Sequence, residues 1–144
     1  MSTKVITHRG LDPDRTPFFK ESSLEAFEDQ LNRGYGIEFD VQFSSDGQMI
    51  VSHDSNLTLD HLTTLPHLIQ LIQNKSAKGS LSALHLKHEN QALEKIDSIL
   101  QALEKIDSSK FIIFDLTIES ATYIKNNNPK IQLAASVSHP YDIL

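Results

Sequence analysis

Two carboxylates stand two residues apart in a segment that is typical of a β-strand. From Gly36 to Gln42, polar residues alternate with Ile, Phe and Val, so Glu38, Asp40 and Gln42 share one face of the predicted strand. Two neighbouring carboxylates repel each other and are costly to bury unless a cation or basic side chains neutralise them. The alternation is compatible with a metal site, and also with a half-exposed strand whose polar face lies in water.

Imidazole and basic side chains stand at the ends of the other predicted strands. These residues are His8, Arg9, His53, His85 and Lys87. In parallel α/β barrels, the active site is built at the C-terminal ends of the strands. Together with the two carboxylates, this set matches metal-assisted chemistry on an anion.

Four of these side chains have defined roles in such chemistry. A divalent cation on Glu38 and Asp40 would polarise a phosphoryl oxygen and lower the pKa of a hydroxyl held beside it. Arg9, as a planar fork, and Lys87, as a point charge, would offset the charge of a phosphate.

Two histidines are the natural acid and base, because imidazole exchanges protons near neutral pH. These are His8 and His53. Each candidate also has a simpler interpretation: His8 as a loop residue, His53-Asp54 as a loop cap, and Lys87 as a side chain that extends to the surface. The hypothesis therefore depends on the placement at successive strand ends rather than on any single residue.

The composition limits the class of protein. With 144 residues and 16.2 kDa, the chain is one domain with enough length to bury a core. The net charge of −6 argues against nucleic-acid binding but leaves room for a small anionic substrate. The absence of cysteine fits a reducing compartment, and no segment is long and apolar enough to insert stably into a membrane. We therefore expect a cytoplasmic protein.

The order of the predicted elements indicates an α/β protein with a parallel sheet. Ser22 is expected to begin the first helix, with Glu25 as its capping-box partner. Asp46-Gly47 predicts a turn between two extended runs. Strands are expected at 5–7, 36–42, 49–51, 84–87, 111–114 and 131–137, and helices from Ser22 to before Gly34, from Pro66 to before Gly79, at 91–108 and at 120–125.

The third of these helices contains an exact duplication. Gln91–Ser98 recurs as Gln101–Ser108. A ten-residue offset does not return to the same helical face, so this is no solenoid repeat. The apolar residues from Leu93 to Ile106 still form one stripe, and we expect a single long helix.

The chain resembles the glycerophosphodiester phosphodiesterases in an ordered set of motifs. These are residues 8–10 (HRG), 21–27 (ESSLEAF), 36–42 (GIEFDVQ) and 45–54 (SDGQMIVSHD), and the resemblance is looser beyond them. It implies a TIM barrel that uses a divalent metal to hydrolyse glycerophosphodiesters to glycerol 3-phosphate and an alcohol. A function in glycerol and lipid metabolism follows from the same resemblance.

The resemblance also implies roles for individual residues. His8 and His53 are the acid/base pair, Glu38 and Asp40 bind the metal, Arg9 contacts the phosphate, Lys87 matches a strand-borne lysine, and Glu21 shapes the site near the metal.

One position departs from the family pattern. The family usually places a third metal-binding glutamate before its strand-borne lysine, where this chain has His85. Histidine is softer than carboxylate, so it would weaken a Mg²⁺ or Ca²⁺ site and favour Mn²⁺. Glu89 or Asp115 is an alternative source of the missing oxygen. We expect a divalent metal (Mg, Ca or Mn) on Glu38, Asp40 and His85.

The length is the second departure. The family barrel has eight strand–helix units over about 250 residues, and this chain contains about five of them. We therefore expect a partial barrel, in which residues 1–144 are the N-terminal portion of a single barrel domain truncated relative to the family. An open partial barrel exposes strand edges, which self-association could cover.

Three functions remain open from the sequence. The first is metal-dependent hydrolysis of a small-molecule glycerophosphodiester. The second keeps this chemistry but acts on a lysophospholipid or another phosphodiester. The third is a non-catalytic or inactive fragment that binds a phosphate ligand or a partner chain.

Overall fold

Parallel strands form the main sheet of the computed structural model, which describes residues 3–14, 18–57 and 62–136. In the order in which they pair, these strands are β1 (Ile6–His8), β2 (Gly36–Phe43), β5 (Ser82–His85), β6 (Phe111–Phe114) and β7 (Gln132–Ala134). All four pairings are parallel. Neighbouring parallel strands need crossover connections, which the chain supplies as helices.

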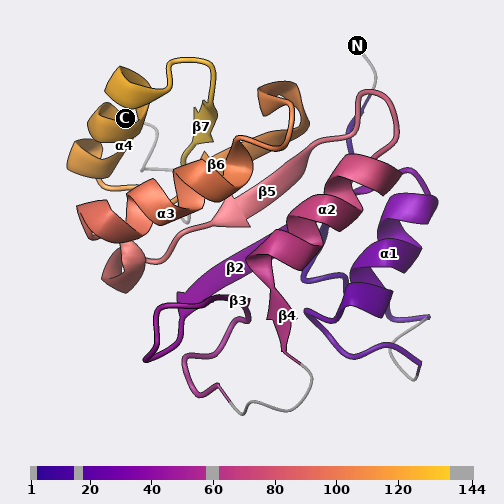
Figure 1. Ribbon diagram of the computed structural model, residues 1–144. Coiled ribbons are helices and arrows are strands. Elements are labelled where there is room, and N and C mark those ends of the chain that lie inside the picture. Colours follow the sequence, from indigo (N-terminus) through magenta and orange to yellow (C-terminus); the bar gives the residue numbers. More distant parts are fainter. Residues whose placement is uncertain (1–2, 15–17, 58–61, 137–144) are drawn as a thin grey trace.

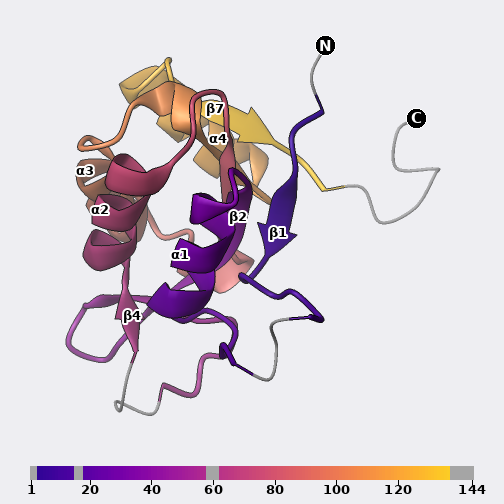
Figure 2. The same ribbon diagram turned by 90° about the vertical axis from the view of Figure 1, so that its right-hand side faces the viewer.

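A helix follows each of the first four parallel strands. These helices are α1 (Leu24–Asn32), α2 (Leu65–Lys75), α3 (Leu93–Leu103) and α4 (Ile118–Asn127). In Figure 1, α1, α2 and α3 lie side by side across one face of the sheet, and Figure 2 shows all three to one side of β1. The expected fold, a partial (β/α) barrel of about five units, is confirmed.

The alternation in β2 separates the core from the polar residues as the sequence predicts. Ile37, Phe39 and Val41 are at most 1% exposed. The ring of Phe39 meets that of Phe27 on α1 edge to face, with centroids 6.3 Å apart. Because side chains alternate along a strand, Glu38 and Asp40 point to the opposite face.

A small antiparallel extension widens one side of the sheet. β3 (Met49–Val51) pairs with the second half of β2, which confirms the turn predicted at Asp46-Gly47, and β4 (Thr63–Thr64) pairs with β3. The amide of Ser52, just after β3, donates to the carbonyl of Asp40 at 3.1 Å. This hydrogen bond holds the segment that carries His53 against β2.

Glycine is required where β2 begins. Gly36 lies between β1 and the start of β5, and a Cβ there would lie 1.8 Å from the carbonyl oxygen of Leu81. No side chain fits such a close approach of two backbones.

The first helix starts one residue later than expected. Its N-cap is Ser23, whose hydroxyl accepts from the amide of Ala26 at 3.2 Å. Ser22 has a φ of 59°, and its backbone is held by hydrogen bonds from its amide to Arg9 and from the hydroxyl of Thr63 to its carbonyl. The predicted capping box of Ser22 with Glu25 is therefore wrong, because the loop fixes Ser22 outside the helix.

The long helix expected at 91–108 is also shorter than predicted. A 3₁₀ turn η1 (His88–Asn90) precedes α3, α3 ends at Leu103, and a second 3₁₀ turn η2 (Ser108–Lys110) follows. The Gln91 side chain donates to the carbonyls of Leu86 and Asp115, which keeps it outside the helix. Leu93 is 51% exposed and does not join the buried stripe.

The bounds of the other predicted strands and helices agree with the structure to within three residues. β4 was not expected, and the end of the last predicted strand, at Val137, lies outside the described residues. No helix in the described ranges is both long and apolar enough to cross a membrane.

Candidate active site

The registers of the parallel strands bring the predicted site residues together. His8 lies opposite Glu38 where β1 pairs with β2, and Asp40 lies opposite His85 where β2 pairs with β5. His8 and His85 are the last residues of β1 and β5, at the strand ends where barrel enzymes build their sites, and Glu38 and Asp40 lie beside them on β2. The expected cluster therefore follows directly from the sheet register.

Two carboxylates and one imidazole form the centre of the cluster. Glu38, Asp40 and His85 each offer a ligand atom, and these atoms lie within 4.8 Å of one another. Burial, followed by the negative charge of Asp40, raises the pKa of Glu38. Burial also acts to raise the pKa of Asp40, but the hydrogen bond and charge of His85 hold that pKa below its ordinary value.

This cluster fits a divalent cation. Within the described part of the chain, Glu38 Oε2 and Asp40 Oδ2 are buried oxygens without a hydrogen-bond partner. A buried acceptor without a donor is costly, and a bound cation would satisfy both oxygens. The donor set of two carboxylates and one imidazole suits Mn²⁺ or a similar ion better than Ca²⁺.

His85 lies between two carboxylates. Its Nδ1 is 2.7 Å from Asp40 Oδ1, and its Nε2 is 2.9 Å from Asp115 Oδ2. The hydrogen bond to Asp40 outweighs burial and, with the charges of both carboxylates, raises the pKa of His85. The ring stacks on Phe114, with centroids 4.8 Å apart.

Arg9 faces the cluster from the tight turn after β1. Its Nε is 3.7 Å from Asp40 Oδ2 and its Nη1 is 3.6 Å from Glu21 Oε2. Both Arg9 and Gly10 have positive φ, and the Arg9 amide donates to the carbonyl of Glu38. This turn places the guanidinium beside the carboxylates, and Glu21 lies on its other side.

The two predicted acid/base residues differ in their surroundings. His8 Nε2 is 3.8 Å from Glu38 Oε2, and the side chain is 62% exposed. His53 Nδ1 is 2.9 Å from Asp54 Oδ1. The contact with Asp54 uses Nδ1 of His53, and Nε2 lies on the other side of the ring.

Lys87 binds the backbone of His53. Its Nζ donates to the His53 carbonyl at 2.5 Å, and the side-chain amide of Gln42 donates to the same oxygen at 3.2 Å. Lys87 therefore lies at the site but is anchored to the loop, a contact that the sequence does not reveal.

Of the two alternative oxygen donors considered from the sequence, one lies beside the site. Asp115 follows β6 directly and contacts His85, whereas Glu89 is an exposed residue of the η1 turn. The position of Asp115 just after a strand is the same sequence signal that points to the other candidate site residues.

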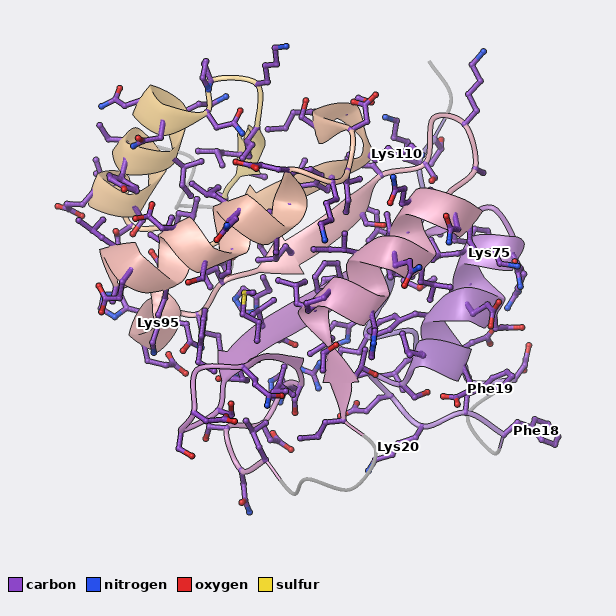
Figure 3. The ribbon with its side chains drawn as sticks, in the orientation of Figure 1. Phe18, Phe19, Lys20, Lys75, Lys95 and Lys110 are labelled. Atoms are coloured by element: carbon purple, nitrogen blue, oxygen red, sulfur yellow. The ribbon has the colours of Figure 1, made fainter. Side chains whose placement is uncertain are left out.

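A cavity of about 800 Å³ lies beside two of the predicted site residues. It lies between the loop that leads into α1 and the segment after β3, and both Glu21 and His53 line it. Phe18, Phe19 and Leu62 give it an apolar part. Figure 3 shows Phe18 extending outward from the loop before α1, and this side chain is among the exposed large hydrophobic residues.

Comparisons with known proteins identify relatives of this chain. The family model for the glycerophosphoryl diester phosphodiesterase family matches residues 8–72. A glycerophosphodiester phosphodiesterase of Bacillus altitudinis is 27% identical over 122 residues, which are 84% of this chain and 47% of that protein. One of Caldanaerobacter subterraneus is 32% identical over 114 residues, which are 78% and 44% of the two chains. The chain thus spans about half the length of the curated relatives it matches.

Solved structures share the fold. A glycerophosphodiester phosphodiesterase of Parabacteroides distasonis has a TM-score of 0.74 at 20% identity, over 92% of this chain and 64% of that one. An Oleispira antarctica phosphodiesterase in complex with the product sn-glycerol-3-phosphate has a TM-score of 0.75 at 20% identity, over 94% and 66%.

Proposed function

Because the chain belongs to the glycerophosphodiester phosphodiesterase family, we propose that it contributes the metal-binding half of an enzyme that hydrolyses glycerophosphodiesters to glycerol 3-phosphate and an alcohol. Residues 1–144 would be the N-terminal portion of the barrel domain. The observation that carries the proposal is the convergence of the side chains of Glu38, Asp40, His85 and Arg9, which come from the neighbouring strands β2 and β5 and the turn after β1. The product named in the Oleispira structure agrees with a glycerol phosphate ligand.

Glu38, Asp40 and His85 would hold the divalent metal, which supplies charge to polarise a phosphoryl oxygen and to lower the pKa of an adjacent hydroxyl. Arg9 would bind the phosphate through its guanidinium fork, which Glu21 and Asp40 flank. In this assignment Glu21 orients Arg9 and has no direct role in proton transfer.

His8 and His53 would move protons to and from the oxygens on either side of phosphorus. The contact of His53 Nδ1 with Asp54 would orient the ring, as a carboxylate does in other acid/base pairs. Lys87 adds positive charge near the phosphate and holds the His53 backbone in place. A neighbouring substrate hydroxyl would attack phosphorus in line as the internal nucleophile and expel the alcohol, and water would then open the resulting cyclic phosphate to glycerol 3-phosphate.

The cavity beside His53 would receive the alcohol part of the substrate. Its lining by Phe18, Phe19 and Leu62 favours, as a second candidate, a lysophospholipid whose acyl chain needs apolar contacts. Either substrate connects the protein to glycerol and lipid metabolism.

A hydrolysis assay tests the proposal. The chain should release glycerol 3-phosphate from glycerophosphocholine, EDTA should abolish release, and Mn²⁺ should restore it. H8A and H53A should each lower the rate by about 100-fold or more. D97N, which changes an exposed residue of α3, should leave the rate unchanged. Turnover that survives both histidine changes contradicts the assigned chemistry, and turnover of lysophospholipid alone selects the second candidate.

A further inference from the structure

Asp115 lies outside the candidate metal-binding cluster and contacts His85. His85 is the imidazole at the position where the family usually has a third metal-binding glutamate. Among the described residues, the cluster with ligand atoms within 4.8 Å of one another comprises Glu38, Asp40 and His85, and Asp115 is not part of it. Asp115 Oδ2 nevertheless lies 2.9 Å from His85 Nε2. Asp115 thus contacts a candidate ligand from the side that faces away from Asp40.

The two nitrogens of His85 are distinguished by these partners. Nδ1 faces Asp40 Oδ1 at 2.7 Å, whereas Nε2 faces Asp115 at 2.9 Å. A ligating histidine usually donates its second ring N–H to a carboxylate or carbonyl, which fixes the tautomer and raises the basicity of the ligating nitrogen. The arrangement around His85 has this form, with Asp115 as the acceptor.

Asp115 is itself held by several contacts. Its backbone has a φ of 63°, and its carbonyl accepts from the side chain of Gln91 at 2.9 Å. Its Oδ1 accepts from the amide of Ser136 at 3.2 Å and from the Ser136 hydroxyl. Only Oδ2 is directed to His85. A residue in such a left-handed conformation, fixed by neighbours, is a common feature of functional sites.

We propose that Asp115 is a positioning residue for metal binding: it accepts the Nε2–H of His85, so that Nδ1 becomes the third ligand atom beside Glu38 and Asp40. When a cation binds, Nδ1 of His85 would release its proton to solvent and, together with Glu38 and Asp40, would hold the cation. The neutral imidazole of His85 and the carboxylate of Asp115 would then together carry one negative charge, which a glutamate ligand would carry alone. This inference rests on the metal dependence in the proposed function.

Mn²⁺ affinity of the 144-residue chain, measured by isothermal titration calorimetry, tests the proposal. D115N keeps the size of the side chain and an oxygen for Ser136, but its amide cannot accept the Nε2–H as a carboxylate does. Loss of such a supporting carboxylate lowers metal affinity by about 10- to 100-fold. D97N, which removes an exposed carboxylate on α3 that accepts from Tyr123, should leave the affinity unchanged.

The D115N substitution in an H85E variant shows whether Asp115 acts by positioning His85 or only through its negative charge. In H85E there is no imidazole to orient, and the new carboxylate would face Asp115, so adding D115N should leave Mn²⁺ affinity unchanged or raise it. Circular dichroism melting in EDTA establishes that each variant is folded.

Three outcomes overturn the inference. These are equal Mn²⁺ affinity in D115N and the parent, the same loss from D115N in the H85E background, and no Mn²⁺ binding by the folded parent. A parent that binds Mn²⁺ with the expected D115N effect but hydrolyses no phosphodiester would contradict the proposed function and leave this inference intact.

Discussion

Asp40 lies directly opposite His85 in the parallel register of β2 and β5, and their side chains meet in a 2.7 Å hydrogen bond. Asp40 is 1% exposed, so this contact pairs a buried carboxylate with the only imidazole among the described residues whose two nitrogens both contact carboxylates. The pair links the fold to the candidate site, because the register that aligns the strands also aligns the two groups.

The pair should make stability depend on pH in a defined window. The raised pKa of His85 stabilises the fold below about pH 6.5, and this contribution is lost as pH rises through the raised value. The lowered pKa of Asp40 stabilises the fold above about pH 3.9, and this contribution is lost as pH falls through the lowered value. In EDTA, H85Q should therefore lower the free energy of unfolding most near pH 5, by about 1.5–3 kcal/mol, and by less at pH 8. Urea denaturation at both pH values measures this cost. A cost that increases with pH would show that the ion pair is not its source.

Glu38 should destabilise the metal-free chain at neutral pH. Its pKa is raised, first by burial and then by the charge of Asp40, so ionisation above about pH 4.3 opposes folding. E38Q should raise the unfolding free energy in EDTA at pH 7 by about 0.5–2 kcal/mol and should weaken Mn²⁺ binding. Thermal melts with and without Mn²⁺ test both effects. An E38Q protein that is less stable in EDTA than the parent would mean that the carboxylate has a structural partner.

The start of α1 can be tested with two adjacent serines. S23A removes the hydroxyl that accepts from the amide of Ala26 and donates to the Lys20 carbonyl. It should lower the free energy of unfolding by about 1 kcal/mol. S22A removes a buried hydroxyl oxygen without a partner in the described residues, and should be neutral or slightly stabilising. Chemical denaturation of the two variants compares them directly. If S22A is less stable than S23A, Ser22 and not Ser23 is the N-cap of α1.

Lys87 should affect turnover more than metal binding. K87M removes the ammonium that binds the His53 carbonyl, so His53 would lose its support. We expect kcat to fall by about 10- to 100-fold, a barrier increase of about 1.4–2.7 kcal/mol, with Mn²⁺ affinity unchanged or raised, because the charge of Lys87 acts on Asp40. K75M provides the control, because Lys75 pairs with Glu28 on the helical layer. If K87M weakens Mn²⁺ binding and leaves kcat unaltered, Lys87 acts on the cluster and not on His53.

The sequence predicted the parts of the site that depend on strand alternation. The alternating residues of β2 place Glu38 and Asp40 together on the polar face, and residues at strand ends locate His8, Arg9 and His85. These features are local, since a strand has a fixed period of two and ends where its apolar run ends.

The sequence could not predict contacts that depend on packing between distant segments. Ser22 looks like an N-cap, but hydrogen bonds with Arg9 and Thr63 hold it outside α1. Gln91 looks like a helix residue, but its side chain joins the ends of β5 and β6. Long-range hydrogen bonds of this kind override local propensity and leave no pattern in the neighbouring residues.

The close approach at Gly36 makes a residue with no reactive group essential for the arrangement of the reactive ones. A methyl group there would have to separate β2 from the Leu81 backbone, and the distance between these strands is the distance across which Asp40 reaches His85. A search for inactivating changes would thus find position 36 alongside the polar residues, although glycine has no side chain that could bind a ligand. The precision of this centre is set by how tightly two main chains can be placed next to each other.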